Sequence, residues 1–180
     1  MKIYRIISNG EYRTFGPKID TRENRTGCRF DGSILDCWKP IHLTTKPVEQ
    51  PGISDEIPDL NFVSTTTPLL TPKAFNILSP YLKPYSQFFE TTTDYGNMFL
   101  VNVTNINDCL DYKNSELKYF SNSERIMRID NYCFFDDKIK DLEIFLIPEE
   151  RKAFPCVTEG LKNIIEENGL NGFRFELLFE

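Results

Sequence analysis

Alternation of hydrophobic and polar residues predicts a strand near each end of the chain. Residues 2–7 alternate and are rich in β-branched side chains, which is typical of a strand. Near the other end, Phe173, Phe175, Leu177 and Phe179 stand at every second position, as expected of a strand with one buried face. We therefore expect both segments to lie in a sheet.

Short apolar runs predict further strands between these two. Residues 98–103 are almost continuously apolar, so we expect them in the middle of a sheet. Residues 94–97 have the composition of a turn that joins this strand to one containing Phe88 and Phe89. The other expected strands cover residues 33–38, 61–64 and 142–147, and residues 61–64 also fit a turn. Apolar residues within 126–135 suggest a further pair of strands.

A first helix is predicted to begin after Thr71. The Thr71 hydroxyl can accept a hydrogen bond from the first turn, and Pro72 fills the first helical position, where no N–H is needed. Pro80 and Pro84 indicate that this helix is short and ends near them.

A second helix is predicted over about residues 158–168, where apolar side chains recur at helical spacing. Gly169 suits the left-handed position that ends many helices. Leu170 can then fold back onto Ile165 in a Schellman closure.

The order of these elements predicts an α+β fold with a mainly antiparallel sheet and two or three helices. A strand-rich N-terminal part should precede an α/β C-terminal part. The length of 180 residues favours a single domain over residues 1–180. The Pro-rich stretch 39–58 is a candidate boundary between two lobes.

Charge is distributed unevenly along the chain. The net charge is −6, yet residues 1–30 hold 7 basic and 3 acidic side chains, a net of +4, which leaves −10 for the rest. The acidic surplus is either ordinary solubilising surface or a face that steers a basic partner. On the second interpretation, the basic N-terminal segment should lie apart from acidic turns that follow residue 84.

The same composition bears on location and on classes of partner. An acidic chain is poorly suited to general nucleic-acid binding. Its apolar runs are far shorter than the roughly 20 residues of a membrane helix. The N-terminal residues lack the apolar segment of a secretory signal. We therefore expect a cytoplasmic protein without a nucleic-acid or membrane partner.

Reactive side chains are few and scattered. The five cysteines are odd in number and show no C-x-x-C spacing, which predicts reduced, mostly buried thiols instead of disulfides or a zinc site. His42 is the only histidine, and we expect it to be structural or exposed. Nucleotide-binding glycine motifs are absent. The sequence therefore predicts no catalytic, cofactor-binding or metal-binding residues.

One enzymatic alternative stays open. An Arg-rich N-terminal segment, the Ser-Thr-Thr-Thr run at residues 64–67 and a distant Glu loosely match the Arg, Ser-Thr-Ser, Glu pattern of ADP-ribosyltransferases. Alternatively, residues 64–67 form a turn that leads toward the cap at Thr71.

Four segments occur in an order that is typical of a known family. They are Asp-Cys-Trp-Lys-Pro at residues 36–40, the apolar strand at residues 98–103, Asp-Cys-Leu-Asp at residues 108–111 and Gly-Leu-Asn-Gly-Phe-Arg-Phe at residues 169–175. The first is similar to a D-x-W-x-P segment and the last to a closing G-L-x-G-x-x-F signature. In this order the segments resemble the Imm11 family of immunity proteins in bacterial polymorphic toxin systems. The resemblance implies a cytosolic protein that binds a cognate toxin domain and blocks it without catalysis.

Acidic turns and strand ends provide an expected interface with such a toxin. Side chains at these places are exposed, and carboxylates there can steer a basic partner. The expected partner-binding residues are Asp94, Tyr95, Asp136, Asp137, Glu149 and Glu150. An adaptor domain unrelated to toxins is a further alternative. The sequence leaves open whether the protein is a monomer or a homodimer.

Overall fold

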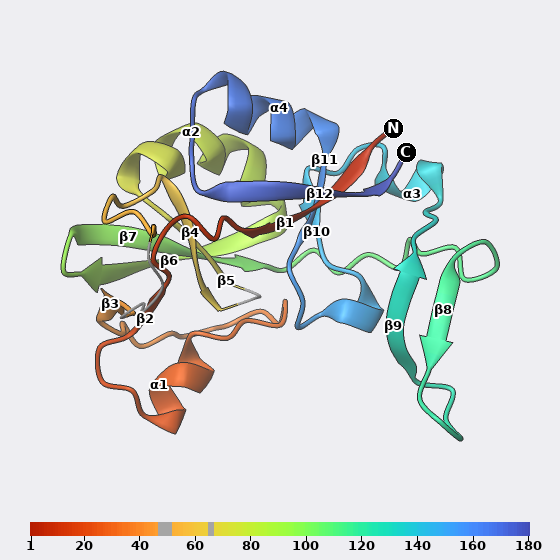
Figure 1. Ribbon diagram of the computed structural model, residues 1–180, viewed down its shortest axis with the longest axis horizontal. Coiled ribbons are helices and arrows are strands. Elements are labelled where there is room, and N and C mark those ends of the chain that lie inside the picture. Colours follow the sequence, from red (N-terminus) through yellow and green to blue (C-terminus); the bar gives the residue numbers. More distant parts are fainter. Residues whose placement is uncertain (47–51, 65–66) are drawn as a thin grey trace.

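Two sheets and a separate hairpin organise the chain in the computed structural model, which describes residues 1–46, 52–64 and 67–180 (Figure 1). The four-stranded sheet has the order β10 (Ile144–Phe145), β11 (Cys156–Thr158), β1 (Ile3–Ser8) and β12 (Phe173–Phe179). The six-stranded sheet has the order β2 (Phe15–Pro17), β3 (Leu43–Thr45), β6 (Ser86–Thr93), β7 (Gly96–Val103), β5 (Thr67–Leu70) and β4 (Leu60–Ser64). Strands β8 (Glu116–Tyr119) and β9 (Ile126–Asn131) form the hairpin.

Four α-helices complete the described part of the chain: α1 (Arg22–Gly27), α2 (Pro72–Leu82), α3 (Asp136–Ile139) and α4 (Glu159–Glu167). The described part also contains two short 3-10 helices, η1 (Lys83–Tyr85) and η2 (Pro148–Glu150). Neighbouring strands pair antiparallel except for β3 and β6. The α+β class and the mainly antiparallel sheets are confirmed, while the short helices α1 and α3 were not predicted.

Strand periodicity divides the apolar side chains between the two faces of each sheet. Along β1, Tyr4 and Ile6 face the side covered by α2 and α4, whereas Ile3 faces the side covered by the hairpin. Along β7, Leu100 and Val101 likewise belong to cores on opposite faces. Strand β7 lies between β6 and β5 and is buried on both sides, as predicted from its continuous apolar run.

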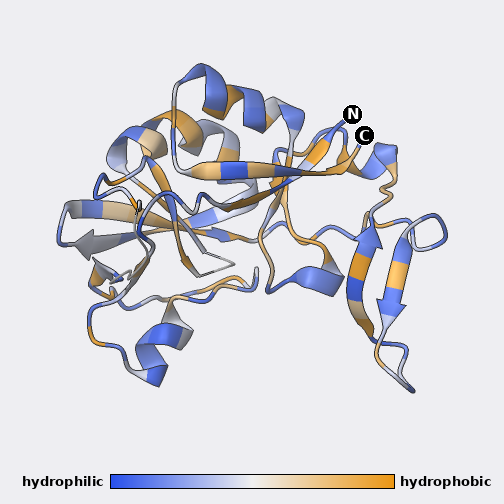
Figure 2. Ribbon diagram, in the orientation of Figure 1, coloured by the Kyte–Doolittle hydropathy of each residue, from blue (hydrophilic) through white to orange (hydrophobic). Residues whose placement is uncertain are grey.

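The core that joins the two sheets, called here the central core, receives side chains from both sheets and from α2 and α4. Its buried members are Ile6, Leu60, Phe62, Leu70, Ala74, Leu78, Leu82, Val101, Val103, Ile144, Leu146, Val157, Leu161, Ile165 and Leu170. Figure 2 shows hydrophobic residues along these strands and mostly hydrophilic residues over α1. No residue of α1 is buried, which explains why apolar spacing did not reveal that helix.

The termini of the two longer helices are those predicted from the sequence. Thr71 Oγ accepts a hydrogen bond from Ala74 N at 3.3 Å at the start of α2. At the end of α4, Gly169 has a φ of 60°, and Leu170 N donates to Ile165 O at 3.1 Å. This 6→1 bond is the expected Schellman closure.

Residues 33–38 do not form the expected strand. They lie over β6 and β7 of the six-stranded sheet, where their backbone meets side chains and not the edge of a strand. Side-chain amides satisfy their backbone instead: Leu35 N donates to Gln87 Oε1 at 2.9 Å, and Asn102 Nδ2 donates to Ser33 O at 2.8 Å. The partial burial of Leu35 and Trp38 therefore comes from packing on the face of a sheet and not from membership of one.

Strand β12 departs from its predicted alternation at one residue. Leu177 is 48% exposed although its alternating neighbours are partly buried. The pairing of β1 with β12 shifts between Ile3 and Tyr4, so Leu178 and Phe179 turn inward in place of Leu177.

The Pro-rich stretch 39–58 contributes to the six-stranded sheet. It contains β3, whose Leu43 is fully buried, while residues 47–51 lie outside the described part of the chain. The lobe boundary expected in this stretch stays a prediction. No helix in the described ranges is long and apolar enough to cross a membrane.

Gly172 provides a test of how β4 meets the turn before β12. Its φ is 110°, and a Cβ placed there would lie 1.9 Å from Leu60 O. Gly96 has a similar φ of 106° but open space around it. We expect Gly172→Ala to lower the free energy of unfolding by about 2 kcal/mol more than Gly96→Ala, because only Gly172 adds a clash to the backbone strain. Urea denaturation of both variants measures this difference, and equal losses would contradict the close approach.

Candidate protein-binding surface

The β8–β9 hairpin projects from the body of the molecule (Figure 1). Its strands pair antiparallel, with Lys118 opposite Arg128 and Tyr119 opposite Ile126. Ile129 is buried and packs with Tyr132 and other residues beneath the four-stranded sheet. The inner side of the hairpin is thus fixed to the body, which leaves its outer side available for contacts.

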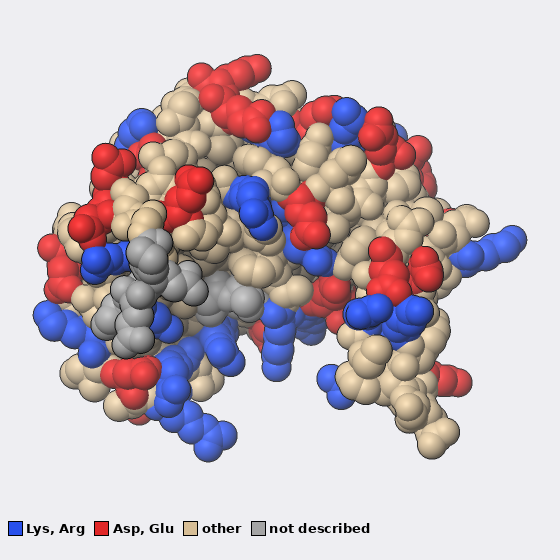
Figure 3. All heavy atoms as spheres, in the orientation of Figure 1, with Lys and Arg blue, Asp and Glu red and all other residues tan. Residues whose placement is uncertain are grey.

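Four large apolar side chains on and beside the hairpin are exposed, and we call them the hairpin patch. They are Tyr112 (48% exposed), Tyr119 (50%), Phe120 (44%) and Met127 (51%). Aromatic residues and methionine are enriched in protein–protein interfaces. Figure 3 shows the hairpin as a projecting lobe whose surface near its tip is mostly uncharged. The composition of this patch is that of a binding surface.

A hollow of about 610 Å³, called here the hairpin groove, lies between the hairpin and η2. It is lined by Tyr112, Phe120, Glu124, Arg125, Ile126, Met127, Pro148 and Glu149. Three members of the hairpin patch therefore line a concave surface that also carries charged side chains. Such a combination suits a partner that presents both apolar and charged groups.

Glu149 is hydrogen-bonded within the groove on one oxygen only. The Tyr112 hydroxyl donates to Glu149 Oε1. This bond, together with partial burial and the nearby Glu149 and Asp108 charges, raises the pKa of Tyr112 to about 12. Glu149 Oε2 is buried and accepts no hydrogen bond in the described structure. The wall of the groove thus contains a covered carboxylate oxygen without a hydrogen-bond donor.

Glu150, the next residue, connects the hairpin region to the four-stranded sheet. Arg5 Nη2 of β1 lies 2.6 Å from Glu150 Oε2, and the Tyr132 hydroxyl lies 2.9 Å from the same oxygen. Arg5 also donates to the Tyr132 hydroxyl. We call these three residues the Arg5 anchor, because they tie β1, η2 and the end of β9 together.

Burial and charge act in opposite directions on the Arg5 anchor. Desolvation alone would lower the pKa of Arg5, but the Glu150 carboxylate and the Tyr132 side chain hold it above its ordinary value. Burial is the main cause that raises the pKa of the Tyr132 hydroxyl, and Glu150 raises it further. The phenol therefore stays protonated and can donate to Glu150 while it accepts from Arg5.

Asp94 and Tyr95 lie in the β6–β7 turn, at the opposite end of the molecule from the hairpin (Figure 1). Asp94 accepts hydrogen bonds from Thr44 Oγ, from His42 Nε2 at 3.0 Å and from Lys18 Nζ at 3.3 Å. These bonds hold the pKa of the Asp94 carboxyl well below its usual range, and the bond from Thr44 has the largest effect. Tyr95 is 53% exposed and makes an edge contact with Phe15.

The other four expected interface residues lie on the side of the molecule that carries the hairpin. Asp136 and Asp137 are exposed in the first turn of α3. Glu149 lines the hairpin groove, whereas Glu150 is bound within the Arg5 anchor. The structure therefore does not gather all six residues on one surface, and their part in binding stays a prediction.

The expected separation of basic and acidic segments is wrong. Lys18 contacts Asp94, and Arg5 forms an ion pair with Glu150, so two basic residues of the N-terminal segment neutralise two of the acidic turns. The physical reason is that β1 and β2 are incorporated in the sheets beside those turns. Long-range strand pairing, which the sequence does not show, decided this arrangement.

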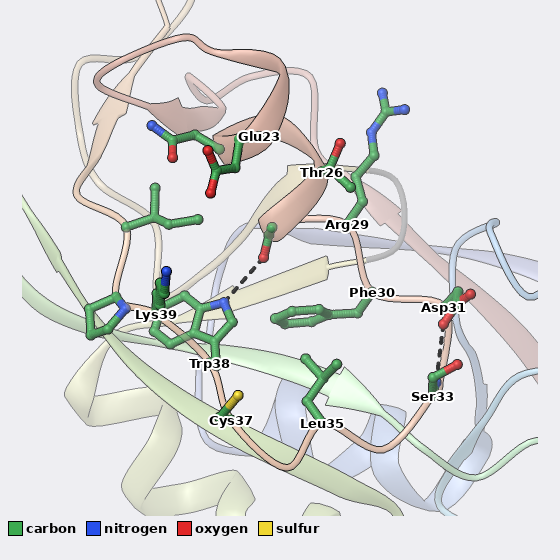
Figure 4. A pocket seen from close by; sticks show the side chains of 14 residues that line it. Glu23, Thr26, Arg29, Phe30, Asp31, Ser33, Leu35, Cys37, Trp38 and Lys39 are labelled. Atoms are coloured by element: carbon green, nitrogen blue, oxygen red, sulfur yellow. Dashed lines mark hydrogen bonds between the residues drawn. The ribbon is translucent and has the colours of Figure 1, made fainter.

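A second concave site of about 450 Å³ lies beneath α1, and Figure 4 shows its lining side chains. Trp38 and Phe30 form part of its wall, and both pack against Phe89. The Trp38 indole N–H donates to Gly27 O at 3.1 Å, drawn as a dashed line in Figure 4. Cys37 also lines this Trp38 pocket. The segment with the Asp-Cys-Trp-Lys-Pro sequence thus builds an aromatic pocket.

Reactive groups in the described structure have structural surroundings. Burial raises the pKa of Cys28 to about 11 and that of Cys109 and Cys156 to about 12. These three thiols are buried, as predicted, while Cys37 is exposed. Within the described ranges, no group of three or more His, Cys, Asp or Glu side chains is placed to hold a metal ion.

The Ser-Thr-Thr-Thr run offers little to the enzymatic alternative. Residues 65 and 66 lie outside the described part of the chain. Thr67 is fully buried: its hydroxyl donates to Cys28 O at 2.7 Å and accepts from Phe30 N at 3.2 Å. This hydroxyl therefore holds the segment before the Trp38 pocket in place.

Sequence analysis missed the hairpin patch. Tyr119 and Phe120 belong to a polar segment in which apolar residues have no clear period, so no strand was predicted there. Met127 lies in the predicted strand region 126–135, but its exposure was not predicted. Their lack of fit to an alternating strand is the signal that could have marked them as exposed. Tyr112 gave no local signal, because its contact with Glu149 joins residues far apart in sequence.

Comparison with known proteins gives one family. A family model described as Immunity protein family (Imm11) matches residues 89–178, which is half of the chain. No curated protein matches the chain. The matched residues include β7, the hairpin, η2 and the closing Gly-Leu-Asn-Gly segment, while Trp38 and its pocket lie outside them.

The Arg5 anchor can be tested by a double-mutant cycle. We expect Arg5→Met and Glu150→Gln each to lower the free energy of unfolding by about 2–4 kcal/mol, because each leaves a partly buried charge or dipole without its partner. The double variant should lose at least about 1 kcal/mol less than the two single losses together.

An exposed ion pair provides the control. Lys162 Nζ lies 2.6 Å from Glu166 Oε2 on the surface of α4, and Glu166→Gln should change stability by no more than about 0.5 kcal/mol. Chemical denaturation measures all four variants. If the Arg5 and Glu150 variants lose no more stability than Glu166→Gln, these residues do not anchor the hairpin.

Proposed function

The chain belongs to the Imm11 immunity protein family, and we propose that it neutralises a cognate toxin domain by binding it and covering the surface that the toxin needs. The protein acts without catalysis, in the cytoplasm of the bacterium that makes the toxin. The family match over residues 89–178 supports the general role. The mode of action is argued from the surface that these residues form.

The hairpin patch is the observation that carries this proposal. It exposes two tyrosines, a phenylalanine and a methionine on a projecting element, inside the matched residues. Contiguous exposed apolar side chains often mark a surface that binds another protein. A few aromatic anchors supply most of the binding energy of such an interface. Occlusion requires a complementary surface of this sort and no reactive group.

Long-range electrostatics supports the same function. The net charge of −6 favours rapid association with a basic toxin domain. Rapid capture is useful to an immunity protein, because a free toxin molecule is harmful before it is bound. The apolar patch would then stabilise the complex after the encounter.

Co-expression tests the proposed function. The toxin domain encoded beside the gene for this chain is induced in a bacterial host with and without the chain, and colony counts are scored. We expect the chain to restore survival to the level of cells that produce no toxin.

Two controls make the result specific. An unrelated acidic protein of similar size should give no protection, and the toxin domain must still be detectable in protected cells. If the chain and the toxin domain are both present in soluble form and the cells still die, the proposed function is wrong.

A further inference from the structure

We propose that the hairpin groove is the docking site for the toxin domain, and that it receives a basic side chain of that domain flanked by apolar groups. This inference rests on the proposed function and adds to it the surface and the chemistry of the partner. Three observations support it: an unused acceptor, an excess of negative charge and an apolar rim.

The unused acceptor is Glu149 Oε2. This oxygen is covered by neighbouring atoms and accepts no hydrogen bond within the described residues, whereas Glu149 Oε1 accepts from Tyr112. A donor on the partner therefore reaches Oε2 only when binding displaces the side chains that cover it. A buried carboxylate oxygen without a donor is unfavourable, so a ligand that supplies one gains affinity. Arginine and lysine are suitable donors, and the guanidinium of arginine matches a carboxylate especially well.

The charges around the groove also favour a cation. The lining residues carry two carboxylates, Glu124 and Glu149, and one cation, Arg125. Neither carboxylate forms an ion pair in the described part of the chain. Arg125 lies over the ring of Phe120, 5.4 Å from its centroid. The surplus of negative charge would repel a phosphate-rich partner and attract a basic protein surface.

Apolar side chains border the same carboxylates. Tyr112, Phe120 and Met127 line the groove and are each close to half exposed. Their rings and thioether can cover the aliphatic part of an arginine or lysine and the apolar residues next to it. A partner without apolar groups would leave this surface in water.

The Arg5 anchor holds the groove in a fixed geometry. Glu150 forms the ion pair with Arg5, and its neighbour Glu149 lines the groove. Because η2 is held in this way, the backbone position of Glu149 is set before the partner arrives. Preorganisation of this kind lowers the entropic cost of association.

Calorimetric titration with a catalytically inactive form of the toxin domain tests the proposal. Glu149→Gln removes the charge of the acceptor, and Met127→Ser removes part of the apolar rim. We expect each to raise Kd at least about tenfold. Glu149→Gln should also reduce the dependence of Kd on salt concentration.

Two substitutions elsewhere serve as matched controls. Glu167→Gln on α4 removes an exposed carboxylate, and Ile19→Ser removes an apolar side chain that is 69% exposed. Both should leave Kd within about twofold of the unsubstituted chain. Circular dichroism and the midpoint of thermal unfolding verify that all four variants are folded.

Each remaining outcome has a defined meaning. If the unsubstituted chain binds and protects but Glu149→Gln and Met127→Ser bind equally well, the docking site is wrong while the proposed function stands. If only Met127→Ser weakens binding, the basic side chain is wrong. If the free chain is a dimer that Met127→Ser dissociates, a second copy occupies the groove, which overturns the proposal. If the unsubstituted chain neither binds nor protects, the proposed function fails as well.

Discussion

The contacts of Arg5 with Glu150 and Tyr132 tie η2 and the residue that follows β9 to the four-stranded sheet. Arg5 occupies the middle of β1, which pairs with β11 on one side and β12 on the other. Its guanidinium reaches Glu150 of η2 and Tyr132 at the end of β9. An interior ion pair is worth little for stability compared with apolar packing, but it is costly to break. We infer that its value here is positional, because it ties η2 and Tyr132 to β1, a strand that is paired on both sides.

Local sequence signals predicted the elements whose boundaries depend on neighbouring residues. The cap at Thr71, the left-handed Gly169 and the buried strand β7 all arise from interactions within a few residues or from a simple period of side chains. The α+β class followed from the order of such elements. For these features, the residues that set the backbone geometry and the pattern of burial lie close together in the sequence.

The remaining features depend on contacts between distant segments. Residues 33–38 have a strand-like pattern, but their backbone groups form hydrogen bonds with the side chains of Gln87 and Asn102. No local signal in the sequence shows this. Asp94 was expected to face a partner, yet Lys18 and His42 occupy its carboxylate. Of the expected site, Glu149 lies in the groove. The exposed aromatic residues beside it were not predicted, because exposed side chains produce no regular spacing of apolar residues along the sequence.

The hairpin groove is the surface through which we propose that the chain binds its toxin. Hydrogen–deuterium exchange of the chain, alone and with the inactive toxin domain, tests it most directly, because it reports on every backbone amide of the folded protein. We predict slower exchange in the complex at residues 112–127 and at Glu149, and unchanged exchange at residues 30–41 around the Trp38 pocket. Slower exchange at residues 30–41 with no change at the hairpin would contradict the claim.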